Sequence, residues 1–223
     1  MKLVRESVQL YYSGNKLNRR SEKSISQFIE KCGRVCYRSE DKMTADSYRD
    51  FIKGLIMKGH ESVLEHASIT MKAISSRGVL NELVRHRIAA YSQESTRYCN
   101  YLSNRFGGLS FIIPSWIEGN SIEDIMRESG PASIWCECME SAEFAYSSLL
   151  RLGWTPEQAR DVLPLSLAST IVATYNIRQW RHILSQRLSK KSHPQMRRLM
   201  GLVYDQFMKY LPSLFEDIKV EKS

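Results

Sequence analysis

The sequence predicts an α+β fold in one domain over residues 1–223, with a mostly antiparallel sheet packed against several long helices. Short stretches of alternating apolar and polar residues are separated by long segments in which apolar residues recur at helical spacing. The 223 residues are 43% hydrophobic, which suffices for a sizeable core. We find no linker, internal repeat or low-complexity segment, so a single ordered domain is the expected organisation.

Two strands and two helices are expected in the first third of the chain. Residues 7–12 and 67–74 alternate between apolar and polar side chains, as half-buried strands do. Residues 21–37 and 45–58 repeat apolar side chains at helical spacing, and Gly59 is placed to end the second helix. The Gly14 position marks a turn after the first strand.

The rest of the chain alternates between helices and short strands. The expected elements are a helix over 77–86, a strand over 109–113, a turn-rich stretch over 116–130, a long amphipathic helix over 132–152, a short helix capped by Thr155, a buried strand over 165–174, and helices over 176–187 and 194–211. The charged residues from Pro212 onward are expected to form a loose tail.

Composition narrows the classes of partner. A net charge of +8 favours phosphate-bearing ligands. The five cysteines are odd in number and follow no secretory leader, so we expect reduced thiols and a cytoplasmic location. No apolar run reaches the ~20 residues of a membrane span. The histidines of 60–66 are six residues apart instead of the four of a zinc protease motif, so no metal site is expected.

Polar clusters interrupt the regular pattern at 60–66, 85–97, Arg160 and 176–187. Arg85, His86 and Arg87 are consecutive, and no helix or strand places three successive side chains on one face. Such a run is typical of a solvated or ion-paired surface, or of a site for a flat anionic ligand such as a nucleotide or a flavin. No Gly-x-Gly-x-x-Gly or Walker loop is present. From the residues alone, the most specific prediction is that the protein binds one or more nucleotides.

One spacing goes further. The pattern Arg85-His86-Arg87, seven residues, then Ser95 with Arg97-Tyr98 resembles the signature of the flavin-dependent thymidylate synthase (ThyX) family. Three other segments resemble family motifs in the same order: Gly59-His60-Glu61-Ser62 with Glu65-His66, Ala159-Arg160 with Leu163-Pro164, and Asn176-Ile177-Arg178 through His182 to Arg187. Together these segments cover roughly residues 20 to 211.

The resemblance implies a role for each matched residue. The residues implied to contact FAD are Ser62, Glu65, Arg85, His86, Arg87, Asn176, Arg178 and His182. Those implied to bind dUMP are Glu82, Gln93, Glu94, Ser95, Arg97, Arg160 and Arg187. His60 is implied to lie near the flavin and the folate, and Arg187 to face the uracil carbonyls, where it would favour developing negative charge in the ring. These two are the catalytic candidates.

The implied reaction is reductive methylation of dUMP to dTMP in a ThyX-like fold. Methylenetetrahydrofolate supplies the carbon, FAD reduced by NADPH supplies the hydride, and no protein nucleophile attacks the pyrimidine. The family also implies a homotetramer with shared active sites, and no stable nucleic-acid or membrane partner. Two departures are visible: Ala90 stands where many members have serine, and about two extra residues lie between Arg187 and His193.

Two alternatives stay open at this point. One is a flavin-dependent methylase that acts on a different uracil nucleotide. The other is a non-catalytic protein that binds nucleotides or RNA, which only the net charge of +8 supports.

Overall fold

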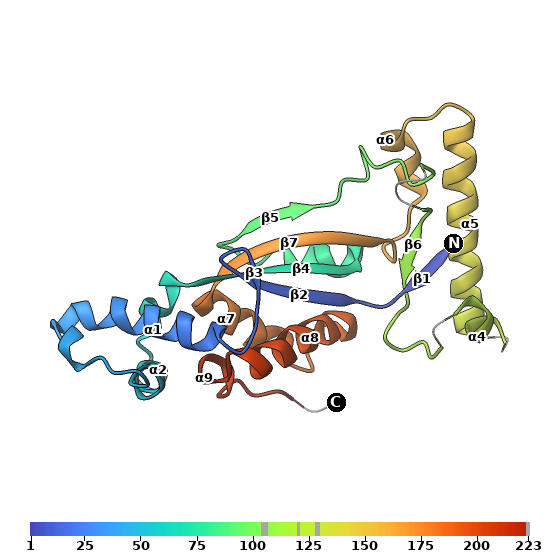
Figure 1. The fold of residues 1–223 in the computed structure, drawn as a ribbon. Helices are drawn as coiled ribbons and strands as arrows, with labels where there is room; N and C mark the ends of the chain where they lie inside the picture. Colours follow the sequence, from blue (N-terminus) through green and yellow to red (C-terminus); the bar gives the residue numbers. More distant parts are fainter. Residues whose placement is uncertain (104–106, 120, 128–129, 222–223) are drawn as a thin grey trace. The chain divides into compact units, whose positions relative to one another are not determined.

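The structure is a computed structural model that describes residues 1–103, 107–119, 121–127 and 130–221 (Figure 1). The chain folds into two compact units, each assembled from separate stretches of sequence. The first unit contains residues 1–7, 73–85 and 92–171, and the second contains residues 8–72, 86–91 and 172–223. The prediction of a single domain over 1–223 stays a prediction.

Five strands form the main sheet in the order β3-β2-β4-β7-β5. Their bounds are β2 Ser7–Tyr12, β3 Asn15–Lys16, β4 Ser68–Ser76, β5 Ala90–Gln93 and β7 Ala168–Asn176. β2 and β3 form an antiparallel hairpin across a turn in which Gly14 has a φ of +77°. β4 and β7 are antiparallel, because the Ile177 amide donates to the Ala67 carbonyl and Thr70 bonds Thr174 at 2.8 Å. The predicted antiparallel sheet is confirmed.

The alternation in β4 and β7 decides which face of the sheet is covered. In β4 the side chains of Ile69 and Met71 are fully buried, while Ser68 and Lys72 are exposed. β7 repeats the pattern, with Ala173 and Tyr175 on its buried face. Alternate side chains of a strand point to opposite faces, so the apolar face is the one that the helices cover.

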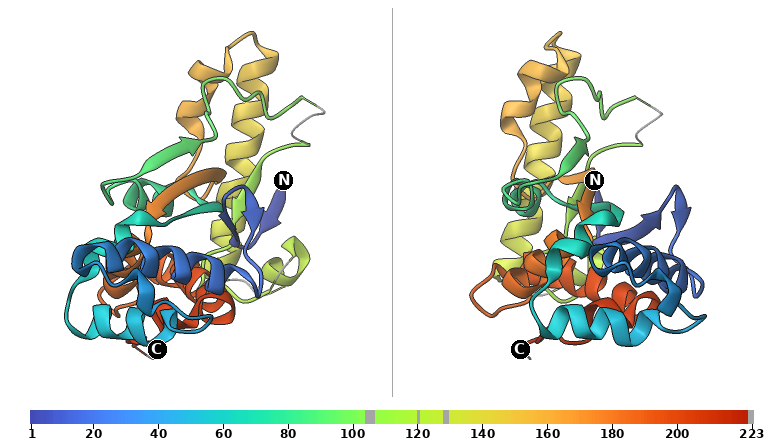
Figure 2. Two further views of the ribbon diagram at one scale, coloured as in Figure 1. Left: turned by 60° about the vertical axis from the view of Figure 1, so that its left-hand side comes forward. Right: turned by 90° about the vertical axis from the view of Figure 1, so that its left-hand side faces the viewer.

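The second unit holds most of the helices (Figure 2). They are α1 Ser21–Arg34, α2 Tyr48–Met57, α7 Ile177–Arg187, α8 Pro194–Tyr210 and α9 Pro212–Phe215, with 3-10 turns at η1 Val35–Tyr37, η2 Glu40–Lys42 and η3 Glu61–His66. Trp180 of α7 stands at the centre of the core. Its ring packs edge-on against Tyr175 and Phe207, and its Nε1 donates to the Ile69 carbonyl at 3.0 Å.

The first unit is built around one long helix, α5 Pro131–Arg151. Its other elements are β1 Lys2–Val4, β6 Ser110–Ile112, α3 Arg77–Leu83, α4 Ile122–Met126, α6 Pro156–Ala159 and η4 Arg160–Val162. β1 and β6 form a parallel pair. Beside them the Arg5 guanidinium donates to four carbonyls, including Ile117 at 3.0 Å and Gly119 at 2.6 Å. Arg5 thereby supplies donors to a loop that has no ladder of its own.

Most predicted elements are confirmed, and their ends differ by a few residues. Thr155 caps α6 through a capping box with Gln158, as expected. The helix expected from residue 45 begins at Tyr48, because Thr44 and Ser47 first form a turn with reciprocal bonds. The buried strand expected from 165 begins at Ala168, because Leu167 still closes a turn on Pro164. β1, β5 and α4 are too short for their patterns to stand out. Residues 120, 128 and 129 of the turn-rich stretch lie outside the described residues.

One expectation is wrong. Residues from Pro212 onward do not begin as a loose tail: α9 follows α8 directly, and Leu214 and Phe215 are completely buried. The Phe215 ring stacks on Phe207 with centroids 4.1 Å apart. The sequence pattern did not predict these buried apolar residues, because charged residues surround them in the sequence. Within the described residues, no helix is long and apolar enough to cross a membrane.

Candidate active site

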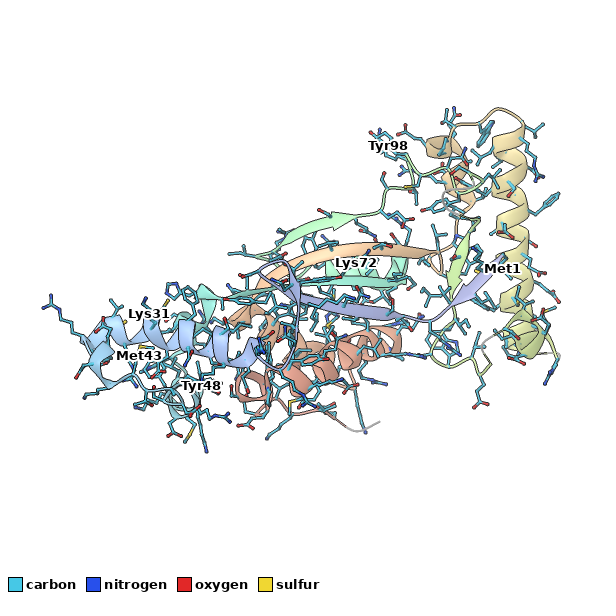
Figure 3. The ribbon with its side chains drawn as sticks, in the orientation of Figure 1. Met1, Lys31, Met43, Tyr48, Lys72 and Tyr98 are labelled. Carbon is cyan, nitrogen blue, oxygen red and sulfur yellow. The ribbon has the colours of Figure 1, made fainter. Side chains whose placement is uncertain are left out.

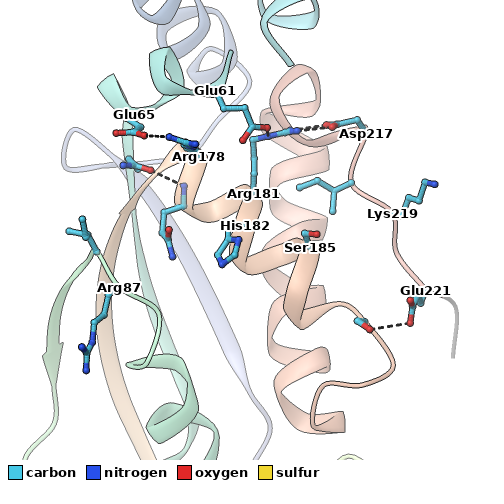
Figure 4. Close-up of a pocket in the computed structure, with 15 residues that line it drawn as sticks. Glu61, Glu65, Arg87, Arg178, Arg181, His182, Ser185, Asp217, Lys219 and Glu221 are labelled. Atoms are coloured by element: carbon cyan, nitrogen blue, oxygen red, sulfur yellow. Dashed lines mark hydrogen bonds and ion pairs between the residues drawn. The ribbon is translucent and has the colours of Figure 1, made fainter. Parts of the chain in front are cut away.

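The second unit contains a cavity of about 900 Å³. Four segments distant in sequence contribute to its lining: the η3 turn, residues 87–88, helix α7 and the C-terminal residues 217–221 (Figure 4). Five residues implied to contact flavin are among those that line it, namely Glu65, Arg87, Asn176, Arg178 and His182. A volume of this size is typical of a site for a large organic ligand.

Helix α7 places its polar residues by its periodicity. Asn176 caps the helix, and its Oδ1 accepts a hydrogen bond from the Gln179 amide at 2.8 Å. Arg178, His182 and Ser185 then fall at i, i+4 and i+7, on one face of the helix and along the cavity. The opposite face carries Trp180 and Leu184 into the core. The amphipathic pattern of this one helix therefore builds both the core and a wall of the cavity.

The charges that line the cavity are mostly paired with one another. Glu65 accepts from Nη1 of Arg178 at 2.7 Å, and both side chains are about half exposed. Arg181 bonds Glu61 and Asp217. The formal charges of the lining balance, but among the described residues the side chains of Arg87 and Lys219 have no hydrogen-bond or ion-pair partner and are therefore available to an anionic ligand.

His86 is buried beside this cavity lining and does not itself line the cavity. Its Nε2 accepts a hydrogen bond from Nε of Arg187 at 2.8 Å, and its ring meets that of His182 edge-on. Burial, together with the positive charge of Arg187 and the proximity of His182, lowers the pKa of His86 to about 4. The imidazole is therefore neutral at pH 7, with Nε2 as acceptor and the proton on Nδ1.

The residues that line the cavity fit an FAD molecule. Arg87 and Lys219 could neutralise a diphosphate, and Asn176, Gln179 and Ser185 could serve the polar groups of its sugar and ring systems. The apolar side chain of Ile88 is 90% exposed and belongs to the same lining. Three implied flavin or folate contacts, His60, Ser62 and Arg85, do not line this cavity and are exposed.

The first unit holds the residues implied to bind dUMP, with the exception of Arg187, which belongs to the second. Glu94 is already engaged there. Its Oε1 accepts from the Tyr101 hydroxyl at 2.6 Å, and its Oε2 from the Thr170 amide at 3.4 Å. Burial and the Glu94 carboxylate raise the pKa of Tyr101, which keeps this hydroxyl a donor. Glu94 therefore fixes the end of β5 to β7 and has little capacity left for a ligand.

Three other residues of the first unit are better placed for a ligand. The Nε2 of Gln93 is buried and has no hydrogen-bond partner among the described residues. Such an orphan donor is costly unless a ligand or water meets it. Arg97 pairs with Glu157 at 2.6 Å, and both are about half exposed. On η4 of the same unit, the Arg160 side chain is half-buried and has no hydrogen-bond or ion-pair partner in the described part of the chain.

Ser95 is not arranged as a nucleophile. Its Oγ accepts from the Arg97 amide at 3.3 Å, and its carbonyl closes the turn to Tyr98 and Cys99. No histidine or carboxylate of the described residues is hydrogen-bonded to it, so nothing activates the hydroxyl. The Tyr98 side chain that follows is 76% exposed and projects from the loop (Figure 3).

This arrangement agrees with a match to one protein family. The family model described as thymidylate synthase complementing protein (Thy1) matches residues 20–213. The chain belongs to this family.

Individual Thy1 relatives agree with that assignment. Over 202 residues the chain is 31% identical to the flavin-dependent thymidylate synthase of Mycobacterium tuberculosis (strain ATCC 25618 / H37Rv), which covers 86% of this chain and 79% of the relative. A protein of the same name from Mycobacteroides abscessus is 32% identical over 205 residues, with the same coverage. The predicted membership of the ThyX family is confirmed, and the protein is an enzyme, a methyltransferase.

A solved structure supports the fold. The UMP/dUMP methylase PolB from Streptomyces cacaoi, in complex with 5-Br dUMP, superposes with a TM-score of 0.76 and 26% sequence identity, over 97% of this chain and 96% of that one. A second structure of the same methylase, with 5-Br UMP, gives a TM-score of 0.70 at 22% identity, which supports the fold alone. The ThyX-like α+β fold is thereby confirmed.

The sequence motifs of the Thy1 family did not reveal the whole lining. The motifs led to Glu65, Arg87, Asn176, Arg178 and His182, but they assigned no role to Arg181 or to the C-terminal residues Asp217, Ile218, Lys219 and Glu221. Arg181 stands among the polar residues of 176–187 and could have been suspected from that position. The C-terminal residues carry no motif, and only the packing of α9 brings them to the cavity.

Proposed function

We propose that this protein is a flavin-dependent thymidylate synthase that converts dUMP to dTMP, with FAD as its cofactor, methylenetetrahydrofolate as carbon donor and NADPH as reductant. Its membership of the Thy1 family and the names of its curated relatives support the reaction class. The observation that carries the proposal is the cavity of the second unit. It gathers five of the eight residues that the family resemblance implies for FAD.

In this proposal the cavity binds FAD through its unpaired cations and its polar helix face. Arg87 would neutralise phosphate charge, and Arg178 would exchange part of its bond with Glu65 for a bond to the cofactor. When bound and reduced, FAD supplies the hydride for the reaction. Cations beside the ring system favour its anionic reduced form. His86 is neutral and buried and does not line the cavity. In this proposal it would position Arg187 by accepting the hydrogen bond from its Nε.

For the nucleotide, Arg97 and Arg160 are the proposed phosphate-binding cations, and the orphan amide of Gln93 is the proposed donor to the pyrimidine. Ser95 would bind through its position at the turn, and no protein nucleophile would attack the ring. Arg187 is proposed to stabilise charge on the uracil carbonyls. Glu82 and His60 remain proposals that rest on the family resemblance.

The proposal is tested by spectroscopy and isotope release. The purified protein is expected to be yellow or to take up FAD stoichiometrically, with flavin absorption in the visible range. With NADPH and methylenetetrahydrofolate it should release tritium from dUMP labelled at C5 and form dTMP. A protein that binds no flavin under any condition, and forms no dTMP, would overturn the proposal.

A second candidate is supported by one observation. One solved structure that resembles this chain is a UMP/dUMP methylase, so methylation of UMP by the present chain is a specific alternative. A panel of dUMP, UMP and dCMP separates the two. Turnover of dUMP at a kcat/KM at least tenfold above that of UMP would favour the first proposal, and the reverse order would favour the second.

The wider family implications are part of the same proposal. They are a homotetramer with shared active sites, the absence of a stable nucleic-acid partner and a cytoplasmic location. Ala90, where many members have serine, is exposed at the start of β5. The change should therefore leave activity intact.

A further inference from the structure

The C-terminal residues 217–221 line the same cavity as the residues proposed to bind flavin. The family model ends at residue 213, and the sequence motifs end before it, so neither assigns these residues a role. We propose that residues 217–221, here called the C-terminal wall, form part of the FAD site and that the Arg181–Asp217 ion pair holds this wall in place. This inference rests on the proposed function, because it takes FAD as the ligand of the cavity.

The C-terminal wall is attached at both ends. Both carboxylate oxygens of Asp217 accept from the Arg181 guanidinium, at 2.7 Å from Nη1 and 2.6 Å from Nη2. At the other end, Oε2 of Glu221 accepts from the Lys190 amide at 2.7 Å and from the Ser189 hydroxyl at 3.3 Å. Between these points Ile218 is largely buried. A bidentate pair fixes direction as well as distance, so the wall has a defined course along the cavity.

Arg181 connects three segments of the cavity lining. It lies on α7 between Arg178 and His182, and its Nε donates to Glu61 of η3 at 3.0 Å (Figure 4). Its Nη1 also donates to the Leu214 carbonyl at 2.6 Å. The Arg181 side chain is only 9% exposed. Removing the Asp217 carboxylate would leave this largely buried cation with Glu61 as its only carboxylate partner and would release residues 217–221 from α7. The position of the C-terminal wall on the lining therefore depends on Asp217.

The charges of the wall are compatible with an anionic cofactor. Both of its carboxylates are hydrogen-bonded: Asp217 is ion-paired with Arg181, and Glu221 accepts from the Lys190 amide and the Ser189 hydroxyl. Lys219, between them, has no partner among the described residues and adds a positive charge. Lys219 is therefore the one group of the wall that would attract the phosphates of FAD, and the wall would confine the molecule by its position.

Two variants test the wall, together with a matched control. Asp217→Asn keeps the shape of the side chain but removes its charge. A chain that ends after Ile218 keeps the ion pair but lacks Lys219 and Glu221. Asp46→Asn is the control, since Asp46 pairs with Lys23 at 4.0 Å on the exposed surface of the same unit. We expect the Kd for FAD, measured by flavin fluorescence, to rise roughly tenfold in both wall variants, the scale seen when supporting groups are removed. The control should bind as the wild type does.

Thermal shifts separate support of the site from general stability. A purely structural role lowers the melting temperature of apo and FAD-loaded protein equally, whereas a role in the site reduces the increment that FAD adds. Asp217→Glu, which restores the carboxylate, should recover most of the affinity. If Asp217→Asn does not fold, the shortened chain decides the question.

Two different failures remain distinguishable. If the wild type takes up no FAD, the proposed function fails, and this inference fails with it. The other failure begins with a wild type that does bind FAD. If the shortened chain and any folded Asp217→Asn protein then bind FAD with unchanged Kd and unchanged thermal increment, only the role proposed for the C-terminal wall is overturned. As an independent check, FAD should slow tryptic cleavage after Lys219 but not after the exposed Lys42.

Discussion

Arg187 donates a hydrogen bond from its Nε to the Nε2 of His86 at 2.8 Å, and the acceptor is a buried, neutral imidazole. The bond joins the middle residue of the Arg-His-Arg signature to the last arginine of the late family motif. A cation cannot donate to an imidazolium, so the bond exists only while His86 is unprotonated. This dependence on protonation makes the pair testable by pH.

We predict that folding stability falls in mild acid because of His86. Its pKa is lowered from 6.5 to about 4 in the folded protein, so between these values the unfolded chain binds a proton that the folded chain does not. Stability must then decrease as pH falls through this window. Because solvent partly screens the group, we expect the free energy of unfolding to fall by about 1–2 kcal/mol between pH 7.5 and pH 5. Urea unfolding at pH 7.5 and pH 5 measures it. His86→Gln, which does not titrate, should lose less over the same interval, and an equal loss would contradict the assignment.

We predict that Arg187→Ala impairs use of dUMP more than binding of FAD. The guanidinium is proposed to face the uracil carbonyls, where negative charge develops during the reaction. Loss of such a donor typically lowers kcat by about 10²-fold or more. Steady-state kinetics with dUMP, together with a flavin titration of the same preparation, gives both quantities. Normal turnover of dUMP together with greatly weakened FAD binding would contradict this assignment and would place Arg187 in the FAD site.

We predict that Arg87→Ala weakens the FAD site and leaves the fold intact. Arg87 is exposed and lines the cavity without a partner among the described residues, so its removal breaks no described contact. The loss of one charge-assisted bond to phosphate corresponds to roughly a tenfold rise in Kd or more. Flavin fluorescence and circular dichroism check the two parts. Arg151→Ala, at the exposed end of α5, is the charge-matched control.

We predict that Glu157→Gln tightens binding of the nucleotide. In the free protein Glu157 holds Nε of Arg97 at 2.6 Å, so a phosphate must compete with it for the guanidinium. Exposed pairs of this kind are worth about 0–1 kcal/mol, which limits the gain to roughly fivefold. Calorimetric titration with dUMP measures the gain. Arg97→Ala should have the opposite effect, and unchanged affinity in both variants would exclude Arg97 from the phosphate site.

We predict that Gly33→Ala destabilises the second unit. A Cβ at Gly33 in α1 would lie 2.7 Å from Cζ of Phe51 and 3.1 Å from Cγ1 of Val63, which is too close for atoms of a packed core. The expected loss is about 1–3 kcal/mol. Gly54→Ala in α2 is the matched control, because nothing lies within 4 Å of its Cβ. Helix propensity should make that variant more stable by about 0.5–1 kcal/mol in chemical unfolding. An equal increase in the free energy of unfolding for Gly33→Ala would contradict the close packing at this position.

The contrast between β4 and β5 shows what a sequence pattern can decide. The nine residues of β4 alternate through several periods, so both its conformation and its buried face were predicted from the sequence. β5 has four residues within a polar run, and its pairing with β7 is fixed by Glu94, whose amide donates to Thr170. A short strand is decided by its neighbours and not by its own periodicity.

The sequence by itself determined the long elements, the α+β class and the family, because these depend on periodicity and on motif spacing that the chain carries locally. It also predicted a functional role for Glu65, Arg87, Asn176, Arg178 and His182, which the structure places on the lining of one cavity. Only the tertiary structure decided that His86 holds Arg187, that Glu94 serves the sheet, and that the residues after Pro212 are packed. The physical reason is the same in each case. Burial and the choice of a hydrogen-bond partner depend on groups that are distant in sequence, so a local sequence pattern does not predict them.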